Sequence, residues 1–340
     1  MEITFEHRLA AHCESGVTTN LLRYYGYNYS EPLVFGLSAS LYFVHLPFIK
    51  TAGFPITTFR PLPGVIFARA MQSLGFKIQK RKFFNKNKGV RQLDSLLEKG
   101  IPTGCVTGMY YLPYLPIEYR FHFNAHNVCV IGKEGDHYLL SEPIVREKVS
   151  IASHDLLRAR YAKGSFPPLG KLYWVKSLPR KEPDLVNLVR QAILKNCYRM
   201  VHQPGPVPFV GVNAFQYLGR RIPKFPRIYG EKKAASLLVH LLQMMEEMGT
   251  GGAGFRFMYA AFLQEAAKIT GIGELNDFSK RLTSIGDQWR IFATDAGRIF
   301  KKRSSANVDY QTLGDHLKEI GKQEKVFFIE LEKVIKNHST

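Results

Sequence analysis

The chain of 340 residues is 45% hydrophobic and 13% aromatic, a composition that supports one large or two ordinary domains and excludes a disordered chain. Its four cysteines lie far apart without a CxxC pair, which excludes a disulfide framework or a zinc knuckle and fits a reducing compartment. The formal net charge of +19 favours an acidic partner. Residues 1–12 lack the basic start and apolar run of a signal peptide, so we expect a cytoplasmic protein.

The first predicted element is a helix over Glu14–Tyr25, because apolar residues recur at helical spacing and Gly26 provides a C-terminal stop. The most apolar stretch, Pro32–Ile49, follows this helix and resembles a short membrane span in length. Proline, glycine, serine and histidine interrupt it, so we expect a buried core segment and no membrane span. Two more helices are predicted over Arg60–Leu74 and Gln92–Lys99, each ended by a glycine.

Strand-like segments follow the third helix. Segments 102–112 and 120–132 are apolar or alternating, and 136–143 pairs naturally with the second of them across a short turn that ends at Gly135. This arrangement predicts a β-hairpin. Segment 170–178 is one more strand. The first half is therefore predicted to be an N-terminal helix packed on a mostly antiparallel sheet.

A domain boundary is predicted at Lys176–Asp184, which is charged and contains two prolines. The remainder carries apolar stripes with a period near 3.6, typical of amphipathic helices. The predicted fold class is α+β, with an N-terminal domain over 1–178 and a mainly α-helical domain over 184–340. The long amphipathic helix at the C-terminus is a candidate surface for a homo-oligomer.

Cys13 stands immediately before the first predicted helix. The dipole and the exposed N–H groups at that helix end favour the thiolate, which is the nucleophilic form of cysteine. The same N–H groups are suited to hold the oxyanion of a tetrahedral intermediate. The small residues Ala10, Ala11 and Gly16 are expected to leave room for a substrate. The alternative is a buried structural cysteine, the commonest role of an isolated cysteine.

A nucleophilic cysteine needs a base, and His126 is a candidate because it heads the apolar segment NVCVIG. A residue at a strand end can project its side chain into a cleft. Glu142, on the hairpin partner, is placed to orient the imidazole. The chain order of cysteine, histidine and acid is that of papain-like proteins, which carry the thiol on the first helix and the other two groups on the sheet.

His122, Asn124 and His126 share one face of the predicted strand and raise the question of a metal site. A structural or catalytic metal site would need further ligands at a matching spacing. The sequence shows no acidic or cysteine ligand at such a spacing, so we expect no metal.

Three further residues are candidates for substrate binding. His12, beside Cys13, either contacts the substrate or packs. Glu31 either serves a turn before Pro32 or contacts an amine on the acceptor. Tyr25 lies in a tyrosine-rich segment that either lines a cleft or packs at the helix end.

Two stretches carry much of the positive charge. Lys77–Arg91 contains seven lysines or arginines and no acid, and Gly219–Lys233 is also rich in basic residues. Such stretches attract nucleic acid, anionic lipid or an acidic carrier protein. No helix-turn-helix, RNA-binding or zinc-finger signature accompanies them, so we expect no nucleic-acid partner. A solvated surface without a specific partner is the alternative.

Residues 12–43, HCESGVTTNLLRYYGYNYSEPLVFGLSASLYF, resemble the opening of the butirosin biosynthesis protein H family. The resemblance rests on the His-Cys-Glu-Ser step at His12–Ser15, on Ser30–Glu31 and on the Phe-Gly-Leu turn at Phe35–Leu37. Segment 126–143 resembles the family's histidine strand and its acid-Pro step. The helical second half resembles the C-terminal domain that usually accompanies this opening, so the resemblance covers nearly the whole chain.

The resemblance implies a papain-like cysteine-peptidase fold and cysteine-dependent acyl transfer. The founding activity of the family moves an acyl group from an acyl carrier protein to an amine of an aminoglycoside. Carried onto this chain, Cys13 is the nucleophile, His126 its base and Glu142 the orienting acid, where papain-like relatives commonly have Asp or Asn. The usual papain oxyanion glutamine is absent before Cys13, so backbone N–H groups, with His12, are expected to serve.

The implied chemistry needs no bound cofactor. The acyl group arrives as a thioester on the phosphopantetheine arm of an acidic acyl carrier protein, and Cys13 attacks it. His126 then takes the proton of a small-molecule amine or alcohol acceptor in a secondary-metabolite or lipid pathway. Two alternatives stay open: a cysteine hydrolase (amidase, peptidase or thioesterase, including an N-terminal nucleophile type), and a non-catalytic basic binding protein with a structural Cys13.

Overall fold

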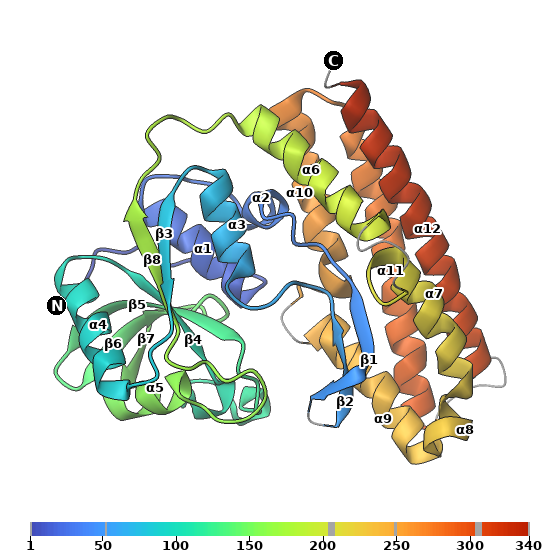
Figure 1. Cartoon of the computed structure of the whole chain (residues 1–340), viewed down its shortest axis with the longest axis horizontal. Helices are drawn as coiled ribbons and strands as arrows, with labels where there is room; N and C mark the ends of the chain where they lie inside the picture. Colours follow the sequence, from blue (N-terminus) through green and yellow to red (C-terminus); the bar gives the residue numbers. More distant parts are fainter. Residues whose placement is uncertain (1, 52, 203–207, 248–249, 303–307, 339–340) are drawn as a thin grey trace. The chain divides into compact units, whose positions relative to one another are not determined.

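The computed structural model describes residues 2–51, 53–202, 208–247, 250–302 and 308–338. The chain divides into two compact units. The first contains Met1–Val34 and Leu62–Pro183, and the second contains Phe35–Pro61 and Asp184–Thr340 (Figure 1). The predicted α+β class is confirmed, because a sheet with its helices is followed along the chain by a mainly helical part.

The first unit is built on a six-stranded antiparallel sheet with the strand order β3-β8-β4-β5-β6-β7. Its strands are β3 (Lys77–Arg81), β4 (Thr103–Thr107), β5 (His126–Glu134), β6 (His137–Ser141), β7 (Val149–Ala152) and β8 (Leu172–Ser177). Its helices are α1 (Cys13–Tyr24), α3 (Val65–Ser73), α4 (Lys86–Glu98) and α5 (Ser153–Arg160), and α2 (Glu31–Leu37) runs from this unit into the second. The predicted hairpin is confirmed, since β5 pairs with β6.

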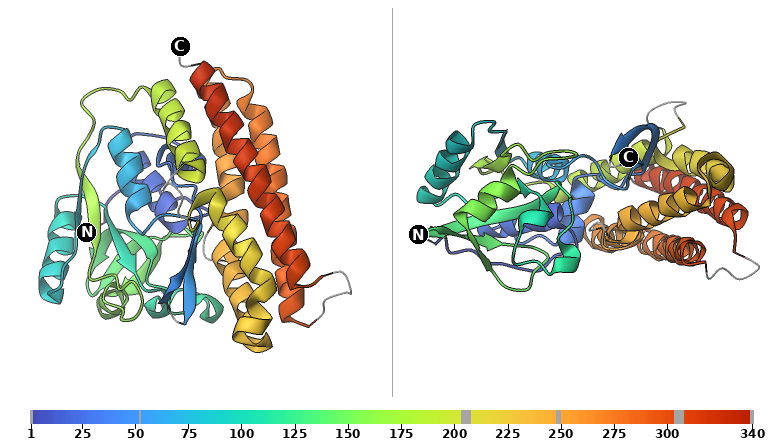
Figure 2. Two further views of the ribbon diagram at one scale, coloured as in Figure 1. Left: turned by 45° about the vertical axis from the view of Figure 1, so that its right-hand side comes forward. Right: turned by 90° about the horizontal axis from the view of Figure 1, so that it is seen from below.

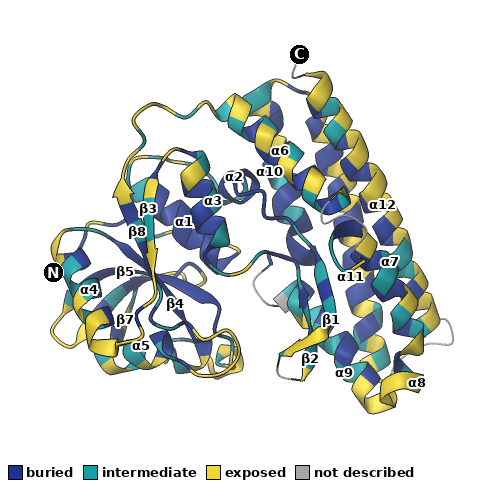
Figure 3. Ribbon diagram, in the orientation of Figure 1, coloured by how far each residue is buried: buried dark blue, intermediate teal, exposed yellow. Residues whose placement is uncertain are grey.

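Different helices cover the two faces of the central strand β5. Side chains alternate between the faces of a strand, and Val128 and Val130 join an apolar core with Leu93 of α4 and Leu156 of α5. Asn127 therefore points to the opposite face, where α1 packs. Helix α1 is almost entirely buried over its first ten residues (Figure 3), so its N-terminal end is held firmly against the sheet.

Two helices of the first unit differ in length from the predictions. Helix α4 begins at Lys86 instead of Gln92, because the Asn85 side chain caps it and accepts a hydrogen bond from the Lys88 backbone N–H at 3.0 Å. Helix α3 is shorter than the predicted Arg60–Leu74, because the chain before it turns through residues 59–64 after strand β2.

The second unit consists of a two-stranded hairpin and a set of helices. The hairpin strands are β1 (Val44–Thr51) and β2 (Phe54–Thr58). The helices are α6 (Leu185–Val201), α7 (Gly211–Arg221), α8 (Phe225–Tyr229), α9 (Glu231–Leu242), α10 (Arg256–Thr270), α11 (Leu275–Phe300) and α12 (Tyr310–Asn337). The long helices α11 and α12 run side by side (Figure 2). Each buries one stripe of its surface and exposes the other, as the predicted helical period requires.

The hairpin β1–β2 requires a correction to the predicted domains 1–178 and 184–340, because it groups with the second unit. The Phe43 ring lies against Phe215 of α7, with ring centroids 4.3 Å apart. The Phe59 ring, just after β2, lies 5.6 Å from Trp289 of α11. These buried rings find their partners far along the chain, and local sequence patterns do not reveal such pairings.

The apolar stretch Pro32–Ile49 forms most of α2, a connection and the first part of β1 instead of one long helix. Residues Leu33 to Leu41 are buried, as predicted for a core segment. Over the part of the chain that the structure describes, no helix combines the length and the apolar character needed to cross a bilayer.

Candidate active site

Cys13 is the first residue of α1, and its neighbours fix that end of the helix. His12 is the N-cap residue, and its Nδ1 accepts a hydrogen bond from the Ser15 backbone N–H at 3.2 Å. The Glu31 carboxylate accepts hydrogen bonds from the backbone N–H groups of Ala11 at 2.8 Å and His12 at 3.0 Å. It also accepts one from the Ser15 hydroxyl at 2.7 Å. A carboxylate at the positive end of the helix dipole is favourable, so Glu31 holds the loop that presents the thiol.

A close approach brings this helix end toward Glu142. A Cβ atom at Gly16 would lie 2.5 Å from Ala10 and 2.6 Å from Pro143, so the packing requires glycine. The Ala10 N–H donates a hydrogen bond to the Pro143 carbonyl at 2.8 Å. The space that these small residues were expected to leave for a substrate is therefore filled by Pro143. Their role is to let Cys13 approach the strand end that carries Glu142.

The structure brings together the three residues predicted as catalytic. His126 is the first residue of β5, and its Nε2 lies 2.8 Å from Oε2 of Glu142, with both side chains buried. The Tyr114 hydroxyl donates a hydrogen bond to the same carboxylate oxygen at 2.8 Å. Because Nε2 faces Glu142, the ring presents Nδ1 for its hydrogen bond with Cys13. Glu142 therefore orients the imidazole toward the sulfur.

Electrostatics at the site favour a thiolate beside an imidazolium. Burial raises the pKa of the Cys13 thiol, but the charge of His12 and hydrogen bonds with His12 and His126 outweigh burial, and the pKa lies well below its usual value. Burial lowers the pKa of His126, but the Glu142 carboxylate and the hydrogen bond with Cys13 raise it to about 10. At neutral pH the buried pair is therefore ionised, with the two charges compensating each other.

The pKa values of the other three cysteines are shifted in the opposite direction. Burial raises the pKa of Cys105 to about 11, and it also raises the pKa values of Cys129 and Cys197. Because the thiolate is the reactive form, Cys13 is distinguished from them by its environment.

A further polar side chain, Asn127, points at the sulfur and was not found from the sequence. It follows His126 on β5, and its Nδ2 donates to the Cys13 sulfur at 3.7 Å. The Tyr173 hydroxyl donates to Oδ1 of Asn127 at 3.0 Å, and Nδ2 also donates to the Ala125 carbonyl at 3.0 Å. These partners fix which way the amide faces, so it is the NH₂ end that meets the sulfur.

Gly104 on β4 makes this contact possible. Strand β4 lies between β8, which carries Tyr173, and β5, which carries Asn127. A Cβ atom at Gly104 would lie 2.0 Å from the Tyr173 ring, so the ring crosses the backbone of β4 only because that residue is glycine. The sequence signals for this arrangement were a polar residue inside an apolar strand and a glycine inside the preceding one.

Tyr25, predicted to bind substrate, is not brought to the thiol. It is the C-cap residue of α1, and Cys13 begins that helix, so the two are separated by about 18 Å along the helix axis. The Tyr25 ring packs on Tyr24 and Phe76, with ring centroids 4.9 and 6.4 Å away. The other two candidates, His12 and Glu31, lie at the thiol end of α1. The Glu31 carboxylate accepts hydrogen bonds from backbone N–H groups of the loop before Cys13.

The strand face considered for a metal does not form, because β5 begins at His126 and residues 120–125, which include His122 and Asn124, lie in an irregular segment before it. The His122 ring stacks on Tyr110 with centroids 4.3 Å apart, and the Asn124 amide donates to two carbonyls in the segment 163–165 at 3.0 Å. Within the described ranges, no group of three or more His, Cys, Asp or Glu side chains is arranged to hold a metal ion.

Comparison with known proteins gives two family matches. The family model for butirosin biosynthesis protein H, N-terminal, matches residues 12–143, and the model for a domain of unknown function (DUF4872) matches residues 154–331. A crystal structure described as a C39-like peptidase from Bacillus anthracis aligns with a TM-score of 0.37 and 16% identity, covering 52% of this chain and 99% of that chain. Comparison with curated protein sequences gives no match.

A cysteine at the start of a helix, facing a histidine that an acid on an antiparallel sheet orients, defines a papain-like cysteine enzyme. The resemblance noted at His12–Ser15 is confirmed. Residues 12–143 match the butirosin biosynthesis protein H, N-terminal, family, whose model spans Cys13, His126 and Glu142, and the chain belongs to the DUF4872 family, whose model matches residues 154–331.

Proposed function

We propose that this protein is a cysteine-dependent acyltransferase. It takes an acyl group from the thioester of an acyl carrier protein, holds it on Cys13 and passes it to a small-molecule amine or alcohol. The observation that carries this proposal is the buried pair of Cys13 and His126, whose pKa shifts favour a thiolate beside an imidazolium. A thiolate exchanges readily with a thioester because one C–S bond replaces another. Burial of the site also limits competing hydrolysis by water.

In the first half-reaction the Cys13 thiolate attacks the carbonyl carbon of the carrier thioester, and a tetrahedral oxyanion forms. The intermediate collapses by breaking the bond to the phosphopantetheine sulfur. That sulfur leaves as a thiol and takes the proton of the His126 imidazolium. The products are the acyl-Cys13 thioester and a neutral imidazole, which Glu142 holds in place at 2.8 Å.

In the second half-reaction the neutral imidazole acts as the base. It takes a proton from the acceptor amine or alcohol while the acceptor attacks the acyl-Cys13 carbonyl. The new tetrahedral intermediate expels the Cys13 thiolate, which regenerates the pair with His126. The balance is one acyl group moved from sulfur to nitrogen or oxygen, with the acceptor's proton ending on the carrier thiol.

Asn127 is suited to be the oxyanion donor of this site. The glutamine that serves this purpose in papain-like proteins is absent before Cys13. The Asn127 NH₂ group already lies against the sulfur and is held by partners other than the substrate. A preorganised donor of this kind, with the N–H groups of the first turn of α1, stabilises the charge that develops next to the attacking sulfur.

Asn127→Ala is expected to slow acylation of Cys13 by a small thioester about 10²–10³-fold. Alkylation of Cys13 by iodoacetamide should change much less, because that displacement forms no oxyanion. Tyr173→Phe, which frees the amide, should give a smaller loss of the same kind. Tyr138→Phe is the control: it removes a hydroxyl on β6 of the same sheet, which donates a hydrogen bond to Asp94 of α4. Equal losses in acylation and alkylation would contradict the oxyanion role.

A basic patch in the first unit supports an acidic carrier as the donor. It comprises the exposed cations of strand β3, of the loop after it and of the start of α4: Lys77, Lys80, Arg81, Lys82, Lys86, Lys88 and Arg91. Phe84, in the middle of this segment, is 78% exposed. A bulky apolar side chain ringed by cations is typical of a surface that receives an acidic protein.

The basic patch also extends toward the thiol. Lys171 is half-buried, and burial lowers its pKa. The Glu14 carboxylate, which follows Cys13 in α1, raises this pKa, whereas the charges of Lys80 and Lys82 in the patch lower it. Lys171 therefore lies in electrostatic range both of the basic patch and of the first turn of α1.

Reversing two charges of the basic patch, Lys82→Glu with Lys86→Glu, is expected to slow acylation by a carrier-bound donor at least about tenfold at low salt. Acylation by a small thioester should be unchanged, and added salt should shrink the difference. The same reversal at Lys224 and Arg227, in the stretch Gly219–Lys233, is the matched control. Equal slowing of both donors would count against docking at the patch.

Intact-mass spectrometry tests the proposed function itself. Mixing the protein with acyl-loaded carrier proteins should add the mass of the acyl group, and the adduct should map to Cys13 and be absent in Cys13→Ala. The adduct should persist in water and disappear when an acceptor amine is added. An adduct that disappears as fast in buffer alone would make the protein a thioesterase. The absence of any adduct across acyl chain lengths, while Cys13 still reacts with iodoacetamide, would refute the proposal.

A further inference from the structure

The Glu142 carboxylate has a second partner besides His126. The Tyr114 hydroxyl donates a hydrogen bond to Oε2 of Glu142 at 2.8 Å, and Nε2 of His126 lies 2.8 Å from the same oxygen. The hydrogen bond that Oε1 accepts from the Ile144 backbone N–H is longer, at 3.4 Å. Glu142 is fully buried, and a carboxylate removed from water is stable in its charged form only when such partners are in place.

A glutamate at this position needs more restraint than a shorter residue. Papain-like relatives commonly have Asp or Asn here, whereas the glutamate side chain has one more rotatable bond and a broad terminal torsion. A single hydrogen bond with His126 would leave the carboxylate free to turn about that contact. Because the Tyr114 hydroxyl meets the same oxygen as the imidazole, the two donors together fix Oε2 on the side that faces the ring.

Tyr114 is placed by the packing of its own segment, residues 108–125 between β4 and β5. Its neighbours Leu112 and Leu115 are buried in the apolar core of the first unit, and the Tyr114 ring packs against the same core. The Leu115 backbone N–H donates to the Leu112 carbonyl at 3.2 Å, which closes a turn around Tyr114. The hydroxyl therefore reaches Glu142 from a ring whose position is set by the core.

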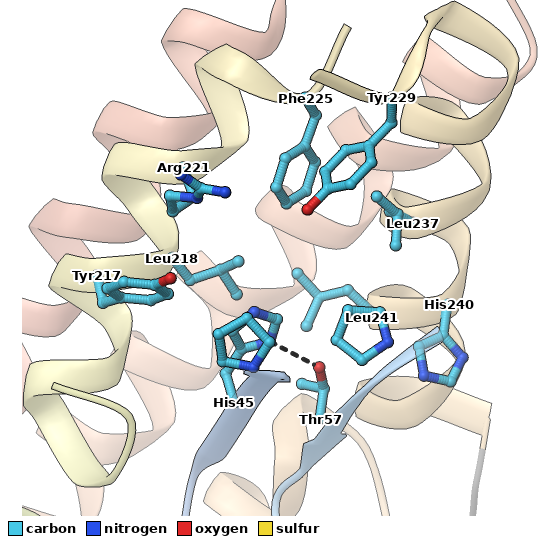
Figure 4. A pocket seen from close by; sticks show the side chains of 12 residues that line it. His45, Thr57, Tyr217, Leu218, Arg221, Phe225, Tyr229, Leu237, His240 and Leu241 are labelled. Carbon is cyan, nitrogen blue, oxygen red and sulfur yellow. Dashed lines mark hydrogen bonds between the residues drawn. The ribbon is translucent and has the colours of Figure 1, made fainter. Parts of the chain in front are cut away.

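A second buried histidine of the chain shows the effect of burial without a carboxylate. His45 lines a cavity of about 30 Å³ in the second unit, room for about one or two water molecules, and its Nδ1 lies 2.9 Å from the Thr57 hydroxyl (Figure 4). None of the residues that line this cavity is Asp or Glu, and burial is the main cause that lowers the pKa of His45 to about 4. Burial acts on His126 in the same direction, but Glu142 and the hydrogen bond with Cys13 raise its pKa to about 10. The imidazolium beside Cys13 therefore depends on Glu142 staying charged and in place.

We propose that Tyr114 is a positioning residue of the active site, whose hydroxyl holds the Glu142 carboxylate charged and turned toward His126. It acts on the thiolate through the hydrogen-bonded series Tyr114, Glu142, His126 and Cys13. The inference rests on the proposed function in one respect, since it takes Cys13 and His126 as the reacting groups. It does not depend on which acyl donor or acceptor the protein uses.

The test is the rate of iodoacetamide labelling of Cys13 in the full-length protein from about pH 4 to pH 10. Tyr114→Phe removes the hydroxyl and leaves the ring in the core. Without this donor the buried carboxylate is less stable in its charged form and less well oriented, so the imidazolium is weakened. The pH of half-maximal labelling should therefore rise, by no more than it does in Glu142→Gln. Acylation of Cys13 by a small thioester should slow about tenfold.

The same substitution in a Glu142→Gln background separates positioning from packing. The glutamine side chain carries no charge for the Tyr114 hydroxyl to stabilise. In this background Tyr114→Phe should change the labelling profile little and slow acylation less than about threefold. A tyrosine that only filled space in the segment would instead give the same loss in both backgrounds.

Tyr111→Phe is the matched control, since Tyr111 lies in the same segment and its ring packs against the same core. Its labelling profile should coincide with that of the native protein. The proposal is overturned if Tyr114→Phe leaves the pH of half-maximal labelling unchanged, if its effects are equal in the two backgrounds, or if Tyr111→Phe produces the same rise. Labelling needs no carrier or acceptor, so a protein that labels as expected but accepts no acyl group would refute the acyltransferase and leave the role of Tyr114 standing.

Discussion

Replacing His126 with alanine is expected to slow acylation of Cys13 by a thioester about 10²–10⁴-fold, and to move the reactivity of the thiol to higher pH. Thiolate forms as the pH rises through the pKa of Cys13, which lies well below its usual value in the native protein. His126 keeps its proton up to about pH 10. Labelling of the native protein should therefore be flat between these two pKa values and fall only below the lower one.

Without the imidazolium of His126, burial has a larger effect on the pKa of the Cys13 thiol. Burial is the largest influence on the pKa of Cys13 and raises it, while His12 and His126 oppose it. In His126→Ala, His12 is the histidine that still opposes burial, so the pH of half-maximal labelling should rise. Glu142→Gln should give a smaller rise, because the ring remains but loses the carboxylate that raises its own pKa.

The measurement is the rate of iodoacetamide labelling of Cys13, followed by mass spectrometry from about pH 5 to pH 10. His154→Ala is the control, since His154 is exposed on α5 and its loss should leave the profile unchanged. A His126→Ala profile that coincides with the native one would show that the imidazole does not maintain the thiolate. The assignment of His126 as acid and base would then fail.

The three predicted catalytic residues could be placed from the sequence because local rules mark each of them. Cys13 precedes a helical period, His126 begins an apolar strand, and Glu142 lies across a tight hairpin from it. Hairpin pairing is local, so its register follows from the turn. The contact between α1 and β5 is not local, and only the family resemblance indicated that the thiol would face this strand.

Other parts of the site depend on strand neighbours that the sequence order hides. Strand β3 pairs with β8, and β8 lies next to β4. Tyr173 therefore reaches Asn127 across Gly104, although the three residues lie on three different strands. A polar residue in an apolar strand needs a partner, but nothing local identifies that partner as a tyrosine on β8.

Glu31 shows a second limit of sequence interpretation. From the sequence, the Glu31 carboxylate is equally consistent with a substrate contact and with a role in a turn. Two of its partners are backbone N–H groups, which every residue except proline possesses, so no side-chain pattern points to them. The β1–β2 hairpin was misplaced for a related reason, because its aromatic partners lie on helices far along the chain.

Replacing Glu324 with alanine is expected to destabilise the second unit by about 3–5 kcal/mol. Glu324 is fully buried on α12, and its carboxylate accepts hydrogen bonds from Arg256 at 2.9 and 2.8 Å and from the Trp289 indole at 2.8 Å. In the variant, the Arg256 guanidinium stays buried with the Gly254 carbonyl and nearby aromatic faces as its described partners. Aromatic faces offset only part of the cost of an uncompensated charge.

Tryptophan fluorescence can measure this loss of stability in the second unit. Of the two tryptophans of the chain, Trp174 lies on β8 of the first unit and Trp289 on α11 of the second. In a Trp174→Phe background, the emission of Trp289 follows the second unit alone. Urea unfolding in that background should show a lower midpoint for Glu324→Ala with an unchanged slope, since the surface exposed on unfolding is the same.

Glu330→Ala is the matched control on the same helix. Glu330 pairs with Arg281 at 2.6 Å, but the two side chains are 49% and 45% exposed, so its loss should cost less than about 1 kcal/mol. Equal costs for the two variants would mean that burial adds nothing to the Arg256 pair. Replacing both charges, Arg256→Met with Glu324→Leu, should recover much of the loss if the unpaired guanidinium is its source. A loss that persisted in the double variant would instead assign it to packing around Trp289.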